Sequence, residues 1–296
     1  MTKPEQANRR RVALSVGTFL VTCASTTYVG GLAYSIPLMS ILLAHELGHY
    51  VAARIHRVPA SPPYFMPLPF GPLGTLGAVI LMSQRIPRRN ALLDIGAAGP
   101  LAGLVVTLPI LIYGIIESPV QPMQEAGVFL QEGHSLLYGG LLYLLKGPFA
   151  DGHDIRLSPT AFAGWAGLLV TMINLIPVAQ LDGGHVAYAL LGSRQERISR
   201  RLRALLLPIG LGVGLYYGLP AYLDGKRGEA LAANIAAGAP WMIWWLALRA
   251  LVSRSGVEHP ETDAGPLSPG RKLVAIGTLV IFLLLVMPSW LRTVIR

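Results

Sequence analysis

Two histidines and a glutamate with the spacing of a metalloenzyme motif stand out in this sequence. His45, Glu46 and His49 form a His-Glu-x-x-His pattern inside an apolar segment. On a helix, residues four apart lie on the same face, so both imidazoles can bind one metal ion. Glu46, beside the first histidine, is placed to transfer a proton. The spacing therefore predicts zinc-assisted hydrolysis.

A zinc site of this kind needs at least one more protein ligand, and Asp182 is the best candidate. The chain has a single cysteine, Cys23, which excludes a Cys-rich site. Apart from Glu46, Asp182 is the only acidic residue well inside an expected membrane span. A carboxylate at membrane depth is costly and by default functional, so we expect Asp182 to bind the metal. An ion pair or packing toward water is the alternative.

The composition indicates a membrane protein. Of its 296 residues, 53% are hydrophobic and 13% are charged, which is about half the charged fraction of a typical soluble domain. The formal net charge of +9 could suggest nucleic-acid binding, but the basic residues form short clusters beside apolar segments. Membrane topology explains such clusters better. We expect a lipid bilayer around the chain and no nucleic-acid partner.

The apolar segments predict an all-α polytopic membrane protein with about six to seven transmembrane helices, because one span needs about 20 mainly apolar residues. The expected spans cover approximately residues 12–30, 35–55, 91–116, 160–191, 204–219, 239–252 and 273–288. Pro177 and the pair Gly183 and Gly184 should interrupt the fourth span. A long loop is expected at 117–158, and a basic linker at 194–203.

Between the second and third spans, repeated prolines forbid a long helix. Residues 74–82 in this region are apolar and interrupted by glycine, which favours a short membrane-associated β-hairpin or re-entrant loop. In the third span, Gly96, Gly99 and Gly103 share one face that permits close helix contact.

The chain should comprise three parts. These are the N-terminal tail and first helix (1–34), a catalytic membrane core (35–192) and the C-terminal helices (193–296).

The distribution of Lys and Arg predicts the orientation in the membrane. With seven spans and a cytoplasmic N-terminus, 18 of the 24 basic residues lie on the cytoplasmic side, and the positive-inside rule is satisfied. The inside set is Lys3, Arg9, Arg10, Arg11, Arg54, Arg57, Arg85, Arg88, Arg89, Arg194, Arg197, Arg200, Arg201, Arg203, Arg249, Arg254, Arg271 and Lys272. Counted from the nearest basic boundary at about 1.5 Å per residue, His45 and Asp182 lie about 14 and 18 Å deep. The site is therefore expected toward the cytoplasmic side, most simply of the cell membrane.

The motifs resemble those of the site-2 protease family of intramembrane zinc metalloproteases. In chain order they are His45-Glu46-Leu47-Gly48-His49, the Gly-Thr-Leu-Gly-Ala stretch at 74–78, Gly99-Pro100-Leu101-Ala102-Gly103, Asn174-Leu175-Ile176-Pro177, and Leu181-Asp182-Gly183. The resemblance implies that His45, His49 and Asp182 hold one Zn²⁺ per chain and that Glu46 is the catalytic base. It also implies that the substrates are transmembrane proteins, cut by regulated intramembrane proteolysis.

A mechanism follows from these residues. Glu46 would take a proton from a zinc-activated water and return it to the leaving amine. The Asn174 amide could stabilise the oxyanion or position the substrate; a tie between two helices is the alternative. Because a transmembrane helix buries its peptide bonds, the substrate must unwind locally. Residues Gly74, Thr75, Leu76, Gly77 and Ala78 could offer it a strand edge, or could form a purely structural re-entrant loop.

The remaining histidines have less specific expectations. His185, one turn after Asp182, could replace or support a ligand, and a supporting or packing role is the better interpretation. The other four lie in expected loops or boundaries and should be solvated; they are His56, His134, His153 and His259.

Two other function classes fit parts of the sequence. A membrane metal-ion transporter would need an acidic or histidine-lined path on both sides of the site, which this sequence lacks. A catalytically silent membrane binding protein is disfavoured because all four residues needed for the chemistry are present. The motifs carry no information on the identity of the substrate or on the oligomeric state.

Overall fold

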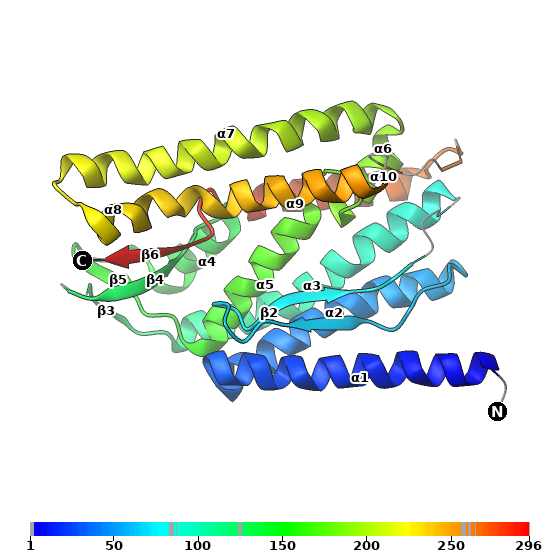
Figure 1. The fold of residues 1–296 in the computed structure, drawn as a ribbon, viewed down its shortest axis with the longest axis horizontal. Coiled ribbons are helices and arrows are strands. Elements are labelled where there is room, and N and C mark those ends of the chain that lie inside the picture. Colours follow the sequence, from blue (N-terminus) through cyan, green and yellow to red (C-terminus); the bar gives the residue numbers. More distant parts are fainter. Residues whose placement is uncertain are drawn as a thin grey trace.

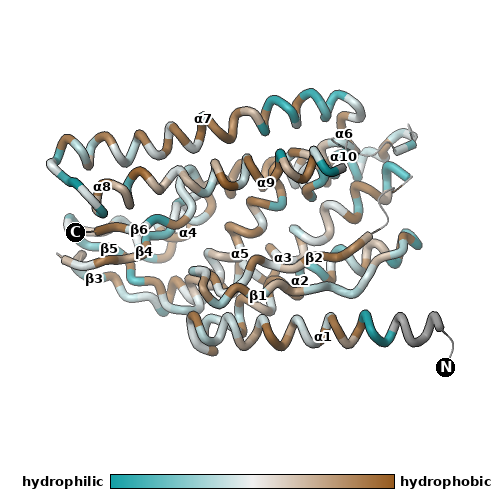
Figure 2. The backbone as a smooth tube through the Cα atoms, viewed as in Figure 1, coloured by the Kyte–Doolittle hydropathy of each residue, from teal (hydrophilic) through white to brown (hydrophobic). Residues whose placement is uncertain are grey.

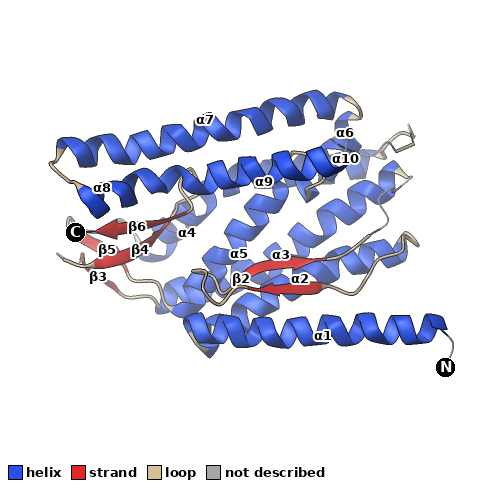
Figure 3. Ribbon diagram, in the orientation of Figure 1, coloured by secondary structure: helices blue, strands red, loops and turns tan. Residues whose placement is uncertain are grey.

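A computed structural model describes residues 3–82, 86, 88–123, 126–255, 259, 262–263 and 265–295. Most of them are helical, and the short strands form three two-stranded sheets (Figures 1 and 3). The helices are α1 (Lys3–Gly30), α2 (Leu32–Ile55), α3 (Arg89–Glu117), α4 (Leu136–Lys146), α5 (Pro159–Leu175), α6 (Asp182–Leu191), α7 (Arg194–Leu223), α8 (Gly228–Ile235), α9 (Ala239–Ser255) and α10 (Pro269–Leu285). The strands are β1 (Tyr64–Pro67), β2 (Thr75–Val79), β3 (Val120–Pro122), β4 (Val128–Glu132), β5 (His153–Ile155) and β6 (Leu291–Ile295). Arg85 and Arg296, which entered the count of basic residues, lie outside the described residues.

Five helices in the described part of the chain are long and apolar enough to cross a membrane. They cover residues 9–30, 32–55, 89–117, 194–223 and 228–254. The last of these comprises α8 and α9, which the short 3-10 helix Ala236–Gly238 joins. The chain is therefore a helical membrane protein, as its composition indicates. The expected fourth span is divided into α5 and α6, because the backbone turns at residues 176–181. The expected basic linker at 194–203 is instead the helical beginning of α7.

Three helix starts are marked by a serine cap. Ser158 and Ser268 each precede a proline in the first turn of α5 and α10, and their hydroxyls accept hydrogen bonds from the backbone N–H groups of Ala161 and Arg271. Ser135 caps α4 in the same way. These residues satisfy backbone donors that a helix start leaves without partners. Proline at the first position has a fixed φ that suits the helix and lacks only a donor that would not be used.

The centre of the molecule is built by α2, α3 and α5, which contact one another along much of their length. Trp165 and Leu168 of α5 are completely buried there, as are Leu111 and Ile115 of α3. Small residues permit the close approach of these helices: a Cβ on Gly164 of α5 would lie 2.7 Å from the Leu111 Cα. The core therefore fixes α3 between the two segments that carry the candidate site residues.

Within the stretch 74–82, for which a β-hairpin or a re-entrant loop was expected, residues 75–79 form the strand β2. It pairs antiparallel with β1, with Phe65 opposite Ala78, and both strands contact α1. Ser25 of α1 donates a hydrogen bond of 2.6 Å to the carbonyl of Gly74, whose positive φ of 72° suits glycine. The β1–β2 pair therefore lies against the first helix.

Two further strand pairs gather at the opposite end of the molecule from the N-terminus (Figure 1). β3 pairs with β5, and β4 pairs with β6 near the C-terminus. The described residues of the long loop expected at 117–158 thus form three short strands besides α4. A strand after the last helix was not expected either, because a run of five residues carries little periodicity.

Candidate active site

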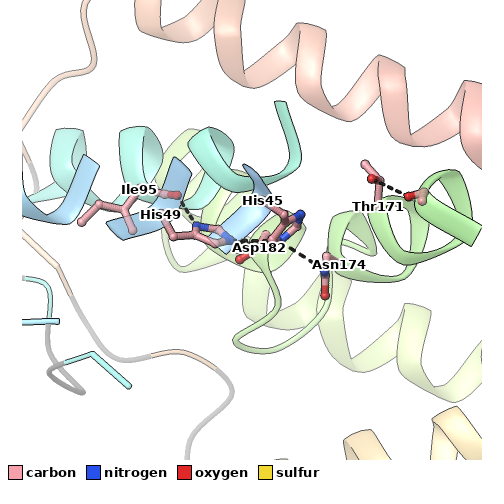
Figure 4. A network of polar contacts seen from close by, with 7 residues as sticks. His45, His49, Ile95, Thr171, Asn174 and Asp182 are labelled. Atoms are coloured by element: carbon pink, nitrogen blue, oxygen red, sulfur yellow. Dashed lines mark hydrogen bonds and ion pairs between the residues drawn. The ribbon is translucent and has the colours of Figure 1, made fainter. Parts of the chain in front are cut away.

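The two histidines of the first motif lie together on α2, and Asp182 lies beside them. His45 and His49 are buried, and their Nε2 atoms are 3.2 Å apart. The Asp182 Oδ2 is 3.2 Å from the Nε2 of His49 and 3.4 Å from the Nε2 of His45 (Figure 4). Residues 133 positions apart in the sequence are thereby brought to one point.

This group has the donors that a metal ion requires. One ligand atom from each of the three residues lies within 4.8 Å of the other two. Two imidazole nitrogens and one carboxylate oxygen form a common set for a catalytic metal site, with a fourth position left for water or substrate. The three side chains therefore fit a bound metal ion.

His49 is oriented by a backbone carbonyl. Its Nδ1 is 2.7 Å from the carbonyl oxygen of Ile95 on α3 (Figure 4). Because a carbonyl can only accept, Nδ1 carries the hydrogen and donates it. This tautomer leaves the Nε2 lone pair pointing at the group, which is how metal-binding histidines are usually held. A backbone contact of this kind has no signal in the sequence.

The glycines of α3 make room for the histidine side chains. A Cβ on Gly99 would overlap the imidazole of His49, and one on Gly103 would lie 3.2 Å from the Cβ of His45. A Cβ on Gly96 would lie 2.9 Å from the Cβ of His185. The expected close helix contact along Gly96, Gly99 and Gly103 is confirmed, and it brings α3 against the site itself.

Asp182 begins α6 and lies directly after the turn at residues 176–181. The amide nitrogen of Asn174, near the end of α5, is 3.3 Å from the Nε2 of His45 (Figure 4). Asn174 therefore lies at the edge of the group and links α5 to α2, a contact that fits both the expected role at the oxyanion and the alternative of a tie between two helices. Glu46 is buried beside His45, with 6% of its surface exposed.

The residues expected to dock a substrate strand lie next to the helix that carries the histidines. β2 contacts α2 as well as α1. Thr75 is buried, and its hydroxyl donates to the carbonyl of Met66 at 2.9 Å. Leu76 is 66% exposed. Gly77 has a positive φ of 97°. In the described part of the chain, β1 is the one strand that pairs with β2.

The expectation of solvated histidines was wrong for two of the four. His259 is buried: its Nε2 lies 2.7 Å from the Nδ1 of His185, and its ring stacks on Tyr188. The Nε2 of His56 is 2.8 Å from the Asp94 carboxylate. Both contacts join segments distant in the sequence, so loop position alone could not predict them. His134 and His153 are exposed.

The fold and the site define a helical membrane protein with a His-His-Asp group that is suited to a metal ion and whose two histidines are buried. The family model of peptidase family M50 matches residues 33–217. The chain belongs to this family, the site-2 protease family, and the resemblance of its motifs is confirmed. The matched range includes all of the site residues described above.

Curated relatives carry related names. The probable zinc metalloprotease EGY2 of Arabidopsis thaliana is 30% identical over 247 residues, covering 82% of this chain and 39% of that protein. EGY2 of Oryza sativa subsp. indica is 33% identical over 60% of this chain and 32% of its own length. The probable zinc metalloprotease EGY1 of Arabidopsis thaliana is 33% identical, with 62% of this chain and 35% of that protein covered. The chain thus spans about a third of the length of these relatives. All three names include the word chloroplastic, which lends no support to a location in the cell membrane.

Proposed function

We propose that this chain is an intramembrane zinc metalloprotease of the site-2 protease type, with membrane proteins as substrates. The observation that carries the proposal is the convergence of His45, His49 and Asp182 from two segments, with Glu46 beside them in an apolar helix. The family membership of the chain and the names of its relatives agree with hydrolysis of peptide bonds. In this proposal the catalytic core is residues 35–192.

The three residues of the group would hold one zinc ion per chain. When bound, zinc supplies a water of lowered pKa and polarises the carbonyl of the scissile bond. Glu46 would accept the proton of the attacking water and deliver it to the nitrogen of the leaving amine. The Asn174 amide would donate to the developing oxyanion, which its place at the edge of the group permits. The reaction consumes one water and releases two peptide ends.

The substrate would bind in an extended form. A transmembrane helix satisfies its backbone hydrogen bonds internally, so its peptide bonds are inaccessible until it unwinds. We propose that residues 74–78 receive the unwound segment by strand addition. The support is that β2 has one strand partner in the described part of the chain and lies against α2.

The N-terminus and the site would lie toward the cytoplasmic side of the membrane, or toward the corresponding side of an organelle membrane. The hydrophilic segments at the beginning of α7 and in α1, which are rich in arginine, lie at the same end of the molecule (Figure 2). The positive-inside rule assigns such an end to the cytoplasmic side. Seven spans, which include α10 and the α5–α6 pair, remain our proposal for the topology.

Replacement of the proposed base tests this function. Glu46→Gln removes the proton acceptor but leaves the three metal-binding side chains, so we expect zinc content near one per chain and cleavage reduced at least about 100-fold. Substrates would first be crosslinked to Glu46→Gln in native membranes and identified by mass spectrometry. Their cleavage by wild-type protein would then be measured in proteoliposomes. Glu229→Gln, at an exposed position of α8, is the control.

Cleavage that survives Glu46→Gln would contradict the mechanism. Zinc transport into the same proteoliposomes, without cleavage, would identify a transporter. A protein that binds membrane proteins but cleaves none of them, in the wild-type form too, would be the silent binding protein.

A further inference from the structure

The turn between α5 and α6 contains a residue in an unfavourable conformation. Ala179 has a positive φ of 50°, in the left-handed region that residues with a Cβ rarely adopt. It is also buried, with 1% of its surface exposed. Strained residues persist where surrounding contacts determine their conformation, and they concentrate near functional sites. Surrounding contacts must therefore hold Ala179 in this conformation.

The first two turns of α7 supply those contacts. The N–H of Ala179 donates a hydrogen bond of 2.9 Å to the hydroxyl of Ser199. One turn earlier on the same face, the Gln195 side-chain amide donates to the carbonyl of Pro177 at 3.4 Å. Ser199 and Gln195 are both completely buried. The helix after the catalytic core thus holds the turn at two backbone positions.

Gln195 also carries a structural disadvantage. Its Oε1 atom is buried and has no hydrogen-bond partner in the described part of the chain. A buried polar atom without a partner costs free energy, so an apolar side chain of similar size would be as good or better for stability alone. A polar residue at this place is better explained by its contact with the turn.

The turn is in direct contact with the start of α6. A Cβ on Gly184 would overlap the carbonyl oxygen of Ala179, and one on Gly183 would overlap the carbonyl oxygen of Leu175. No side chain separates these backbones, so a displacement of the turn must displace the first turn of α6. Asp182 is the first residue of that helix.

We propose that Ser199 and Gln195 are positioning residues, which place the Asp182 carboxylate against His45 and His49 by holding the 176–181 turn. Both residues act on the His-His-Asp group through the backbone of the turn. The inference deepens the proposed function, because it assigns to α7 a part in building the metal site. The motifs that carry the family resemblance all precede residue 186 and do not include α7.

The first test measures the turn itself in metal-free protein. Amide hydrogen exchange of residues 176–185 would be followed by mass spectrometry in the wild type and in Ser199→Ala. We expect about 10-fold faster exchange in this segment and unchanged exchange in α2, because the Ala179 amide loses its acceptor. Ser193→Ala, at the exposed start of α7, is the matched control and should leave exchange unchanged. This measurement requires neither zinc nor activity, so it stands even if the proposed function fails.

The second test measures the consequence for the site. In Ser199→Ala the dissociation constant for zinc, measured by competition with a chelator, should rise about 10-fold, as supporting residues of metal sites generally show. Ser199→Thr, which keeps the hydroxyl, should bind zinc with the affinity of the wild type. Gln195→Met should weaken zinc binding while leaving the thermal unfolding temperature unchanged or raised, which a purely structural role would not produce. In an activity assay, Ser199→Ala and Gln195→Met should lower kcat and leave KM unchanged.

Unchanged exchange at 176–185 would overturn the inference. Faster exchange with unchanged zinc affinity would also overturn it, since the turn would then not position Asp182. If Ser199→Ala does not fold, Gln195→Met takes its place in both measurements, with the same decisive outcomes.

Discussion

At the scale of single residues, the site depends on a glycine as much as on the metal-binding side chains. Gly99 leaves the space that the His49 ring occupies, and the Ile95 carbonyl four residues earlier sets the tautomer of that ring. One helix, α3, therefore both admits and orients the histidine. A site of this kind tolerates little change of volume, because packed interiors have few voids.

Gly99→Ala should displace His49. The added methyl group overlaps the imidazole, so the ring must turn or α3 must shift, and we expect zinc affinity to fall about 10- to 100-fold. Chelator competition measures the change. Gly212→Ala on α7 is the control, because its Cβ would meet no atom within 4 Å. An affinity for zinc within twofold of the wild type in Gly99→Ala would show that the contact is not restrictive.

At the scale of elements, the functional parts are joined where regular structure ends. The α5–α6 break places Asn174 before the turn and Asp182 after it, which a continuous helix could not do with both residues at one point. The short strand β2 lies next to α2, and the bond from Ser25 to Gly74, the residue before the strand, holds it against α1. Both elements rely on longer helices for their positions.

Proline in β2 tests its proposed role. Leu76→Pro and Ala78→Pro remove one backbone N–H each, and a substrate paired as a strand would lose a hydrogen bond and its register. We expect cleavage to fall about 10-fold or more while zinc content and unfolding temperature stay near those of the wild type. Leu76→Ala, which keeps the N–H, should cleave nearly normally. If both proline variants fold and cleave as the wild type does, strand addition is wrong.

At the scale of the whole molecule, the C-terminal part closes back on the core. β6 pairs with β4, and α10 contacts α3, α5 and α6. Arg271 of α10 donates to both oxygens of the Asp94 carboxylate, at 2.9 and 2.7 Å. The segment after the matched range of the family model therefore encloses the same core rather than forming a separate unit.

The proposed orientation can be tested by labelling. In a Cys23→Ala background, single cysteines would replace Ser193, at the basic end, and Asp151, at the end with the small sheets; both positions are exposed. With intact cells, or with intact organelles if the protein resides in an organelle membrane, and a membrane-impermeant maleimide, we expect Asp151→Cys to react at once and Ser193→Cys only after permeabilisation. The reverse pattern would invert the topology without affecting the site.

Much of the site could be predicted from the sequence because its signals are local or rare. The spacing of His45 and His49 follows from helix periodicity, and Asp182 is conspicuous because a carboxylate in an apolar segment is costly. The glycine face of α3 is also a local pattern. Membrane class follows from composition, since long apolar segments need no knowledge of their partners.

Only the tertiary structure decided how these parts meet. The bond from the Ala179 N–H to Ser199, the burial of His259 against His185 and the pairing of β4 with β6 each join residues that local patterns treat as independent. Such contacts depend on the summed packing of many helices, which no short stretch encodes. The sequence alone therefore determined the chemistry available to this chain and its membrane setting. The packing of the helices decided which backbone and side-chain groups position the site residues.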